Sequence, residues 1–377
     1  MDALTTPSNW QRVRLGDICE IVKGQQINKI SLNNTDKYPV INGGIDFLGH
    51  TNKFNVSKNT IAISEGGTCG YVRFMTSNFW SGGHNYSLQK ISNKVNNLCL
   101  YHILKSYEKD IMKLGVGSGL KNIQLKVLKD FEIPIPPLHE QIAIANILSG
   151  LDRYLYSLDA LILKKESVKK ALSFELLSQR KRLKGFNQNW QRVRLGDVGK
   201  PCMCKRVMKH QTTRYGEIPF YKIGTFGNTA DAFISKKLFL EYKTKYSFPK
   251  KGDILISASG TIGRAVIYDG KPAYFQDSNI VWIDNDETLV KNDFLFYAYS
   301  NVKWNTEHTT ILRLYNDNFR NTLIPLPPLN EQIAIANILS GLDSEIISLK
   351  NKKRQFDNIK KALNHDLMSA KIRVLKK

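Results

Sequence analysis

Two long stretches of the chain carry apolar residues at steps of three and four positions, which keeps one face of an α-helix apolar. Pro136–Pro137 and Pro327–Pro328 precede these stretches, and proline ends a strand and suits a first helical turn. Each helix could run for about 40 residues, or ~60 Å, so we expect the two to pair as an antiparallel coiled coil. Lys165 and Lys353 interrupt the apolar seams, which indicates local control of register or breaks in the seam. The apolar positions are Leu148, Leu151, Leu155, Leu158, Ile162, Val168, Leu172 and Leu176 in the first stretch, and Leu339, Leu342, Ile346, Leu349, Phe356, Ile359, Leu363 and Leu367 in the second.

The rest of the chain shows short β-branched runs separated by Gly, Asn and Ser turns, which is typical of strands. Such runs occupy residues 60–64, 253–257, 265–268 and 279–283, and helical patterns appear near 98–114 and 291–303. We therefore predict a mixed α+β fold in which two α/β globules, each with a mixed or antiparallel sheet, alternate with the two long helices. The expected domains are residues 1–136 and 185–327 for the globules, and 137–184 and 328–377 for the helices.

The chain is an internal duplication. The sequence NWQRVRLGD occurs at residues 9–17 and again at 189–197, and EQIAIANILSGLD occurs at 140–152 and again at 331–343. Packing alone tolerates swaps among similar apolar residues, so thirteen unchanged residues suggest one surface that is used twice. Recent gene conversion is an alternative explanation for the identity.

The centres between these identical blocks, residues 18–135 and 198–326, share only islands of sequence. One island is ISEGGTCG at 63–70 against ISASGTIG at 256–263, and another matches Asn85 with Asn279. Divergent surfaces on a common frame should bind different examples of one class of target.

The net charge of +22 indicates that the target is a polyanion such as nucleic acid. General solubility is the alternative explanation. We expect no membrane partner and no secretory signal, because no apolar run approaches ~18 to 20 residues. The five cysteines are odd in number and form no zinc-binding pattern, which favours reduced thiols, a cytoplasmic location and no metal site.

Three motifs in this order resemble the specificity (S) subunit of type I restriction–modification systems. They are W-x-x-V-x-L-G-D at the start of each half, P-L-P-P-L-x-E-Q-x-x-I-A at the start of each long helix, and G-D-I-L-I-S-x-S-G-T-I-G at residues 252–263. The first copy of the second motif departs from the pattern in having Ile135 in place of its first leucine. The resemblance implies that each globule is a target-recognition domain for one half of a split double-stranded DNA sequence. It also implies that the helices form a spacer that docks two methyltransferase (M) subunits, which methylate adenine at N6, and that restriction (R) subunits join them.

The same resemblance implies a non-catalytic chain that holds no cofactor, because S-adenosylmethionine, ATP and Mg belong to the partner subunits. The sequence contains no phosphate-binding G-x-x-x-x-G-K-[ST] run and no Asn/Asp-Pro-Pro-Tyr/Phe tetrad, and the glycines of 115–119 read as a loop. Three alternatives stay open: the recognition subunit of a related (type IIB-like) split-site system, an autonomous DNA-modifying enzyme, and a structural coiled-coil scaffold.

Candidate DNA-reading residues are polar or basic side chains in or beside the glycine-rich loops of the two globules. In the first globule they are Thr68, Tyr71, Arg73, His84, Asn85, Lys121, Asn122 and Gln124. In the second globule they are Ser259, Thr261, Arg264, Gln276, Asn279, Arg313, Tyr315 and Asn316. Any of these side chains could instead hold a loop through bonds to the backbone.

Candidate partner-binding residues are the repeated polar pairs at the helix starts, Glu140, Gln141, Glu331 and Gln332. Their repetition fits contact with two identical M subunits, but they could equally act as caps and partners of the helix dipole. The basic clusters at 180–184 and 350–354 could contact phosphates or form solvated helix faces.

Overall fold

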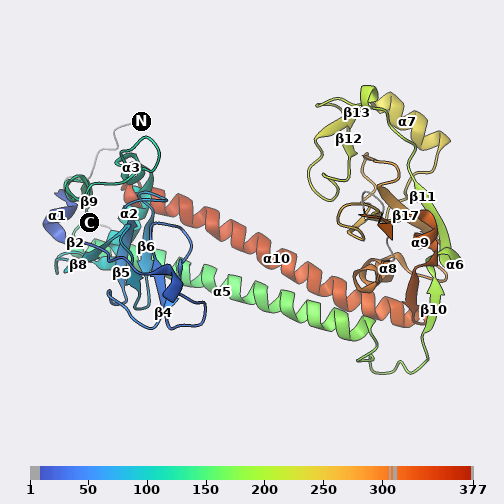
Figure 1. Cartoon of the computed structure of the whole chain (residues 1–377), viewed down its shortest axis with the longest axis horizontal. Helices are drawn as coiled ribbons and strands as arrows, with labels where there is room; N and C mark the ends of the chain where they lie inside the picture. Colours follow the sequence, from blue (N-terminus) through green and yellow to red (C-terminus); the bar gives the residue numbers. More distant parts are fainter. Residues whose placement is uncertain (1–8, 305–306, 309–311, 375–377) are drawn as a thin grey trace. The chain divides into compact units, whose positions relative to one another are not determined.

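The computed structural model describes residues 9–304, 307–308 and 312–374, and the chain divides into two compact units. Unit 1 comprises Met1–Ala160 and Lys350–Lys377, and unit 2 comprises Leu161–Leu349. Each unit holds one globule together with a segment of both long helices, α5 and α10 (Figure 1). These helices span Leu138–Leu177 and Leu329–Met368 and have 40 residues each, so the predicted length is confirmed.

The described residues of the globule in unit 1 form three small sheets and four short α-helices. The four-stranded sheet is antiparallel with the order β2-β8-β5-β6 (Glu20–Lys23, Asn85–Gln89, Thr60–Ser64, Val72–Met75). The three-stranded sheet is mixed with the order β4-β3-β7 (Gly49–Thr51, Tyr38–Ile41, Trp80–Ser81), and β1 pairs with β9 (Gln11–Arg14, Glu132–Ile135). The helices of this globule are α1, α2, α3 and α4, the first of them a single turn (Leu15–Ile18, Asn97–Ser106, Glu108–Lys113, Leu125–Lys129).

Unit 2 repeats this topology strand for strand. Its four-stranded sheet has the order β11-β17-β14-β15 (Gly199–Met203, Ile280–Asn285, Ile254–Ser257, Ala265–Ile267). Its three-stranded sheet has the order β13-β12-β16 (Ala232–Ile234, Ile218–Tyr221, Tyr274–Phe275), and β10 pairs with β20 (Gln191–Arg194, Leu323–Leu326). The short pair β18 and β19 (Glu307–His308, Leu312–Arg313) is added, and the helices are α6, α7, α8 and α9 (Leu195–Val198, Lys236–Lys245, Asn292–Ala298, Asn316–Asn321).

The mixed α+β class and the duplication are therefore confirmed, and the divergent centres share one topology. The greater length of the second centre is accounted for in part by α7, which the sequence pattern did not predict. This helix lies between β13 and β14, where the first centre has no helix between β4 and β5 among the residues described.

The repeated blocks pack into the hydrophobic core of each unit. In unit 1, Ile144 and Leu148 of α5 pack with Leu367 of α10 against the apolar side of the globule. In unit 2, Ile335 and Leu339 of α10 occupy the corresponding place in the core. Burial of these identical residues explains why this face of the block stays apolar in both copies.

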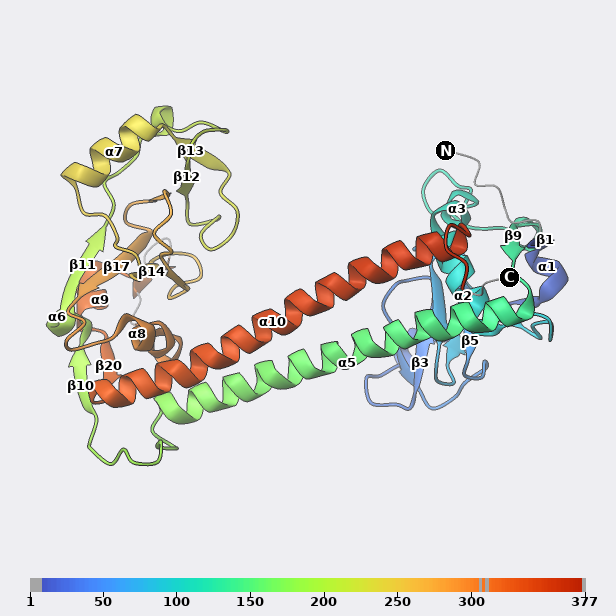
Figure 2. The same cartoon turned by 180° about the vertical axis from the view of Figure 1, so that it is seen from behind.

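Within each unit α5 and α10 lie side by side and antiparallel (Figures 1 and 2). In unit 1, Lys353 pairs with Asp159 at 2.7 Å. In unit 2, Lys165 pairs with Glu345 at 2.8 Å. The two lysines that interrupt the apolar seams thus form ion pairs across the helices, which specify register as an e/g pair does in a coiled coil.

Candidate nucleic-acid interface

A glycine-rich loop follows the second central strand of each unit, at residues 64–70 after β5 and 257–263 after β14. The amide of the last loop residue donates to the carbonyl of the first at 2.8 Å in unit 1 and 2.9 Å in unit 2. Gly67 and Gly260 have φ angles of 69° and 64°, which favour glycine because it lacks a Cβ. The two loops therefore have the same backbone conformation despite their different sequences.

In unit 1 the backbone of Glu65 connects the glycine-rich loop to two other segments of the chain. The backbone of Glu65 donates to the carbonyl of His84 at 2.8 Å and accepts from the amide of Ile123 at 2.9 Å. These bonds bring Gly66, His84 and Asn122 together. We call these three residues the reading positions of unit 1.

Unit 2 makes the same bonds with different residues. The backbone of Ala258 donates to the carbonyl of Asn279 at 2.8 Å and accepts from the amide of Leu314 at 2.9 Å. The reading positions of unit 2 are therefore Ser259, Asn279 and Arg313. Each corresponds in turn to Gly66, His84 and Asn122 of unit 1.

This register corrects the sequence-based match of Asn85 with Asn279. Ile63 lies opposite Tyr86 in unit 1 and Ile256 lies opposite Val281 in unit 2, so His84 is the counterpart of Asn279. Asn85 is only 2% exposed. The shared island was too short to fix the register, and a slip of one residue turns a strand residue to the other face.

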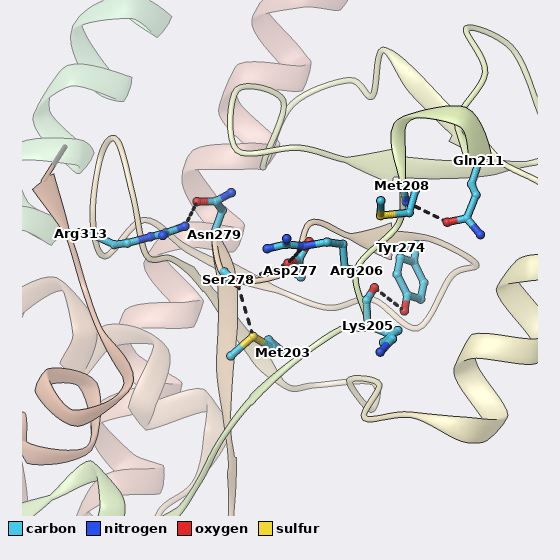
Figure 3. A network of polar contacts seen from close by, with 10 residues as sticks. All are labelled: Met203, Lys205, Arg206, Met208, Gln211, Tyr274, Asp277, Ser278, Asn279 and Arg313. Atoms are coloured by element: carbon cyan, nitrogen blue, oxygen red, sulfur yellow. Dashed lines mark hydrogen bonds and ion pairs between the residues drawn. The ribbon is translucent and has the colours of Figure 1, made fainter. Parts of the chain in front are cut away.

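The reading positions of unit 2 form a hydrogen-bonded cluster. Arg313 Nη2 donates to Asn279 Oδ1 at 3.0 Å (Figure 3). Ser259 Oγ donates to the same oxygen at 2.8 Å. Asn279 and Arg313 belong to the wall of a hollow of about 440 Å³. The hollow is lined by Arg206, Val207, Lys209, Thr212, Phe220, Lys222, Gln276, Asp277, Ser278, Asn279 and Arg313.

This hollow is basic. Arg206, Lys209, Lys222 and Arg313 outnumber its one carboxylate, Asp277, which pairs with Arg206 at 2.8 Å. Arg206, Lys209 and Lys222 were not among the residues predicted from sequence. The cluster of basic residues near 205–209 was a signal that could have identified the first two.

The reading positions of unit 1 are built without a cluster of this kind. A Cβ at Gly66 would come within 2.3 Å of Asn122 Oδ1, so the amide can occupy its present position because residue 66 is glycine. His84 is exposed, and its backbone amide donates to Asn42 Oδ1 at 3.0 Å. Lys121 is exposed next to Asn122.

A buried carboxylate supports these positions from below. Glu65 accepts from Lys23 Nζ at 2.7 Å and from the Tyr86 hydroxyl at 3.1 Å. Burial, followed by the charge of Glu65, raises the pKa of Tyr86, so its hydroxyl stays protonated. The same hydroxyl contacts the carbonyl of Ile123 at 2.9 Å, which holds the segment that carries the third reading position.

The other candidates in unit 1 lie around this centre. The Arg73 guanidinium stacks over the rings of Phe47 and Tyr71, at 5.0 and 5.3 Å from their centroids. The backbone amide of Thr68 donates to the carbonyl of Gly43 at 2.8 Å. Gln124 is exposed and immediately precedes α4.

The other candidates in unit 2 divide into two groups. Gln276 lines the hollow, where its Oε1 accepts from a backbone amide at 2.9 Å. Thr261, Tyr315 and Asn316 are exposed, and Arg264 Nη2 donates to a backbone carbonyl at 3.3 Å. None of these last four belongs to the wall of the hollow.

The candidate partner-binding pair of unit 1 is buried. Glu140 accepts from Arg373 Nε at 2.9 Å, from Arg373 Nη2 at 3.1 Å and from Trp10 Nε1 at 3.3 Å. We call this arrangement the Trp–Glu–Arg clamp. Gln141 Oε1 accepts from the amide of Asn96 at 2.7 Å and so ties the start of α5 to the start of α2.

Unit 2 repeats the clamp. Glu331 accepts from Arg182 Nε at 2.9 Å, from Arg182 Nη2 at 2.8 Å and from Trp190 Nε1 at 2.9 Å. Gln332 Oε1 accepts from the amide of Lys291 at 2.8 Å, at the start of α8.

These contacts give the four repeated polar residues a structural role. Each is at most 2% exposed, so little of their surface is left for a partner, and direct contact with an M subunit stays a prediction. Arg182, in the basic cluster at 180–184, forms part of the clamp of unit 2. Lys181 of the same cluster pairs with Glu175 at 2.9 Å.

Each copy of the repeated block exposes two isoleucines at the same places. Ile142 and Ile147 on α5 are 44% and 39% exposed, and their counterparts Ile333 and Ile338 on α10 are 42% and 36% exposed. At 3.6 residues per turn, two side chains five positions apart lie about 140° apart around the helix, so the two isoleucines of each copy flank its buried face on either side. The apolar pattern of the sequence does not distinguish these exposed isoleucines from the buried apolar residues of the same block.

The described residues hold no group of three or more His, Cys, Asp or Glu side chains placed to bind a metal ion. Burial raises the pKa of Cys99 and Cys204 to about 12, which keeps these thiols protonated. Among the helices of the described residues, none is both long and apolar enough to cross a bilayer.

Comparison with known proteins gives one family. The model of the type I restriction modification DNA specificity domain matches residues 7–165 and again 187–356. A protein of Haemophilus influenzae, assigned as a type I restriction enzyme specificity subunit, is 41% identical over 324 residues, which cover 81% of each chain. The MjaVIII type I restriction enzyme specificity subunit of Methanocaldococcus jannaschii is 26% identical over 99% of this chain and 95% of its own.

Solved structures agree on the fold. The S subunit of a type I restriction–modification system from Mycoplasma genitalium superposes with a TM-score of 0.69 at 24% identity, covering 95% of this chain and 96% of that chain. A chain from a structure of the type I restriction–modification system gives a TM-score of 0.54 at 16% identity, covering 97% of this chain and 98% of that one.

Proposed function

The chain belongs to the type I restriction–modification DNA specificity family and is a specificity subunit, and from this premise we propose how its two units divide the work. Unit 1 reads one half of a split double-stranded DNA sequence and unit 2 reads the other half. The paired helices α5 and α10 set the gap between the halves. The chain carries no active site of its own.

One observation carries this proposal: the two units build the same frame and fill it with different side chains. The backbone bonds around Glu65 and Ala258 are the same, but the reading positions are Gly, His and Asn in unit 1 and Ser, Asn and Arg in unit 2. Side chains that differ on one frame, in loops beside a basic hollow, suit recognition of different base edges.

Phosphate contacts supply grip that does not depend on sequence. The net charge of +22 and the basic residues of the hollow, Lys209 and Lys222 among them, favour binding to the DNA backbone. Binding should therefore weaken steeply with salt for every sequence, while discrimination between sequences depends on the reading positions.

Two M subunits dock on the repeated helix starts, through the exposed isoleucines and not through the buried Glu and Gln pairs. Ile142 and Ile147 in unit 1 are matched by Ile333 and Ile338 in unit 2, so one partner surface fits both. Exposed isoleucines that are kept identical in the two copies support a docking surface common to both. S-adenosylmethionine, ATP, Mg and the nuclease activity belong to the M and R subunits.

The proposal is tested by exchanging residues 18–135 for the corresponding centre of another family member. DNA methylation by the assembled complex is then mapped at base resolution. We expect one half of the methylated sequence to change while the other half and the gap stay the same. A change in both halves would contradict the division between units, and methylation by the chain without M subunits would contradict the non-catalytic role.

A further inference from the structure

The third reading position carries Asn122 in unit 1 and Arg313 in unit 2, held by the same backbone bond. In the major groove, guanine presents two acceptors, O6 and N7, which an arginine meets with two N–H groups. Adenine presents an acceptor at N7 and a donor at N6, which an asparagine amide meets with one N–H and its oxygen. We infer that Arg313 reads a guanine in one half-site and Asn122 reads an adenine in the other. This inference rests on the proposed function.

Arg313 is held in place before DNA arrives. Its Nη2 donates to Asn279 Oδ1 at 3.0 Å, and Ser259 Oγ donates to the same oxygen at 2.8 Å. Two donors on one atom identify that atom as the amide oxygen. The oxygen of Asn279 faces the guanidinium of Arg313 (Figure 3). Because a guanidinium carries five N–H donors in a fixed fork, this bond orients Arg313 and uses one of the five.

A guanidinium that is oriented in advance loses less conformational entropy when it binds a base. Arg313 lies at the wall of the basic hollow, which Lys209 and Lys222 also line. Lys222 pairs with Asp231 at 2.9 Å, so Lys209 is the better placed of the two to contact a phosphate. Asn279 and Ser259 are therefore positioning residues for Arg313.

Asn122 meets the requirements of an adenine reader. Its backbone amide and carbonyl both bond to Val116 at 3.0 Å, so the backbone does not depend on the side chain. Gly66 leaves space for its amide where unit 2 has Ser259, since a Cβ at this glycine would lie 2.3 Å from Asn122 Oδ1. The exchange of Ser for Gly and of Arg for Asn thus changes two contacting positions together.

The test uses the full chain assembled with its M subunits and a library of randomised duplex DNA. Bound sequences are compared for the unchanged chain, Arg313→Ala, Asn122→Ala and the control Lys209→Ala. We expect Arg313→Ala to lose preference for one guanine in one half-site, with about a 5- to 150-fold loss of discrimination, equivalent to ~1–3 kcal/mol. We expect Asn122→Ala to lose one adenine in the other half-site. Lys209→Ala should weaken binding to all sequences equally.

In each variant the half-site read by the untouched unit shows that the complex has folded and bound. If the unchanged chain selects no split sequence, the proposed function fails. If it selects one, but Arg313→Ala alters no single position, weakens all sequences equally, or affects a base pair other than G·C, only the inference about Arg313 is overturned. The same criteria apply to Asn122 and A·T.

The positioning role has a separate readout. Asn279→Asp keeps an oxygen acceptor for Arg313 and should keep the guanine preference, whereas Asn279→Ala should reduce it at the same base pair. A uniform loss across the half-site in Asn279→Ala would show that Asn279 supports the loop and not Arg313.

Discussion

Units 1 and 2 differ most where their side chains face outward and least where the chain holds itself together. The Trp–Glu–Arg clamp has the same residue types in both units, with both glutamates at most 2% exposed. The reading positions have no residue type in common at equivalent places, although the same backbone bonds hold them. Buried polar contacts therefore specify the frame of each unit, and the reading positions are free to differ.

The Trp–Glu–Arg clamp can be disrupted in one unit at a time. Glu331→Gln leaves Arg182 facing a neutral amide in a buried place, and we expect a loss of about 3–5 kcal/mol in the stability of unit 2. Glu140→Gln should do the same to unit 1 by a smaller amount, because its bond to Trp10 is longer, 3.3 Å against 2.9 Å in unit 2.

The measurement is urea unfolding followed by hydrogen exchange of peptides from each unit. Glu345→Gln is the matched control, since Glu345 is a half-exposed partner of Lys165 and its loss should cost less than about 1 kcal/mol. Equal effects of Glu331→Gln and Glu345→Gln would contradict the role of the clamp.

Introducing a charge tests the exposed isoleucines that both units have in common. Ile142→Asp with Ile333→Asp places a charge in each proposed docking face, and we expect about a hundredfold loss of affinity for M subunits, or ~2.7 kcal/mol. Leu163→Asp, on α5 outside the repeat and 64% exposed, is the control and should bind M subunits normally. Affinity can be measured by calorimetry with purified M subunits. Normal binding by the double variant would exclude this face as the docking surface.

One buried contact has changed its chemistry between the units. Tyr297 donates to Asp343 Oδ2 at 2.8 Å in unit 2, whereas unit 1 has His102, whose Nε2 lies 3.9 Å from Asp152 Oδ2. Burial and the charge of Lys360 lower the pKa of His102 to about 4, although Asp152 opposes the shift. Only unit 1 should therefore respond to mild acid through this position.

The unfolded chain, with a histidine pKa near 6.5, takes up the proton first as the pH falls. The stability that His102 contributes is thus fully present above pH 6.5 and is lost between 6.5 and about 4, by at most about 3 kcal/mol. His102→Tyr, which copies unit 2, and His102→Gln should both flatten the pH dependence of unit 1 in that window. An unchanged pH profile in both variants would contradict this origin.

The smallest difference lies between the paired helices. The rings of Tyr154 and Phe356 contact each other in unit 1 with centroids 4.7 Å apart and planes tilted by 56°. The positions 191 residues away hold the ion pair of Glu345 and Lys165. Lys165→Phe with Glu345→Tyr should stabilise unit 2 by about 0.5–1 kcal/mol and remove the salt dependence of this contact. Unfolding midpoints at low and high salt test this, and a destabilised double variant would show that the two sites pack differently.

The sequence predicts the repeated parts of the molecule well. The apolar periodicity and the proline pairs give the two 40-residue helices, and the strands near 60–64 and 254–257 follow from their β-branched runs. Helix α7 was missed because its apolar face is weak, although Ser235 caps it by accepting from Leu238 at 3.2 Å.

The site is harder to predict because its contacts join distant residues. Glu140 and Arg373 are 233 positions apart, and local pattern does not pair them. The repeat was a usable signal, because Arg182 and Arg373 are separated by the same 191 positions as the two clamp glutamates. The reading register could not be fixed from an island of a few residues, which left His84 and Asn85 open to a one-residue slip.

The central claim is that unlike side chains on one frame give the two halves of the recognised sequence. It is tested most directly by a chain in which residues 198–326 are replaced by a copy of residues 18–135, assembled with M subunits and mapped for methylation. The account predicts a methylated sequence with two identical halves, each equal to the half that unit 1 normally reads. Methylation that keeps two different halves would contradict it.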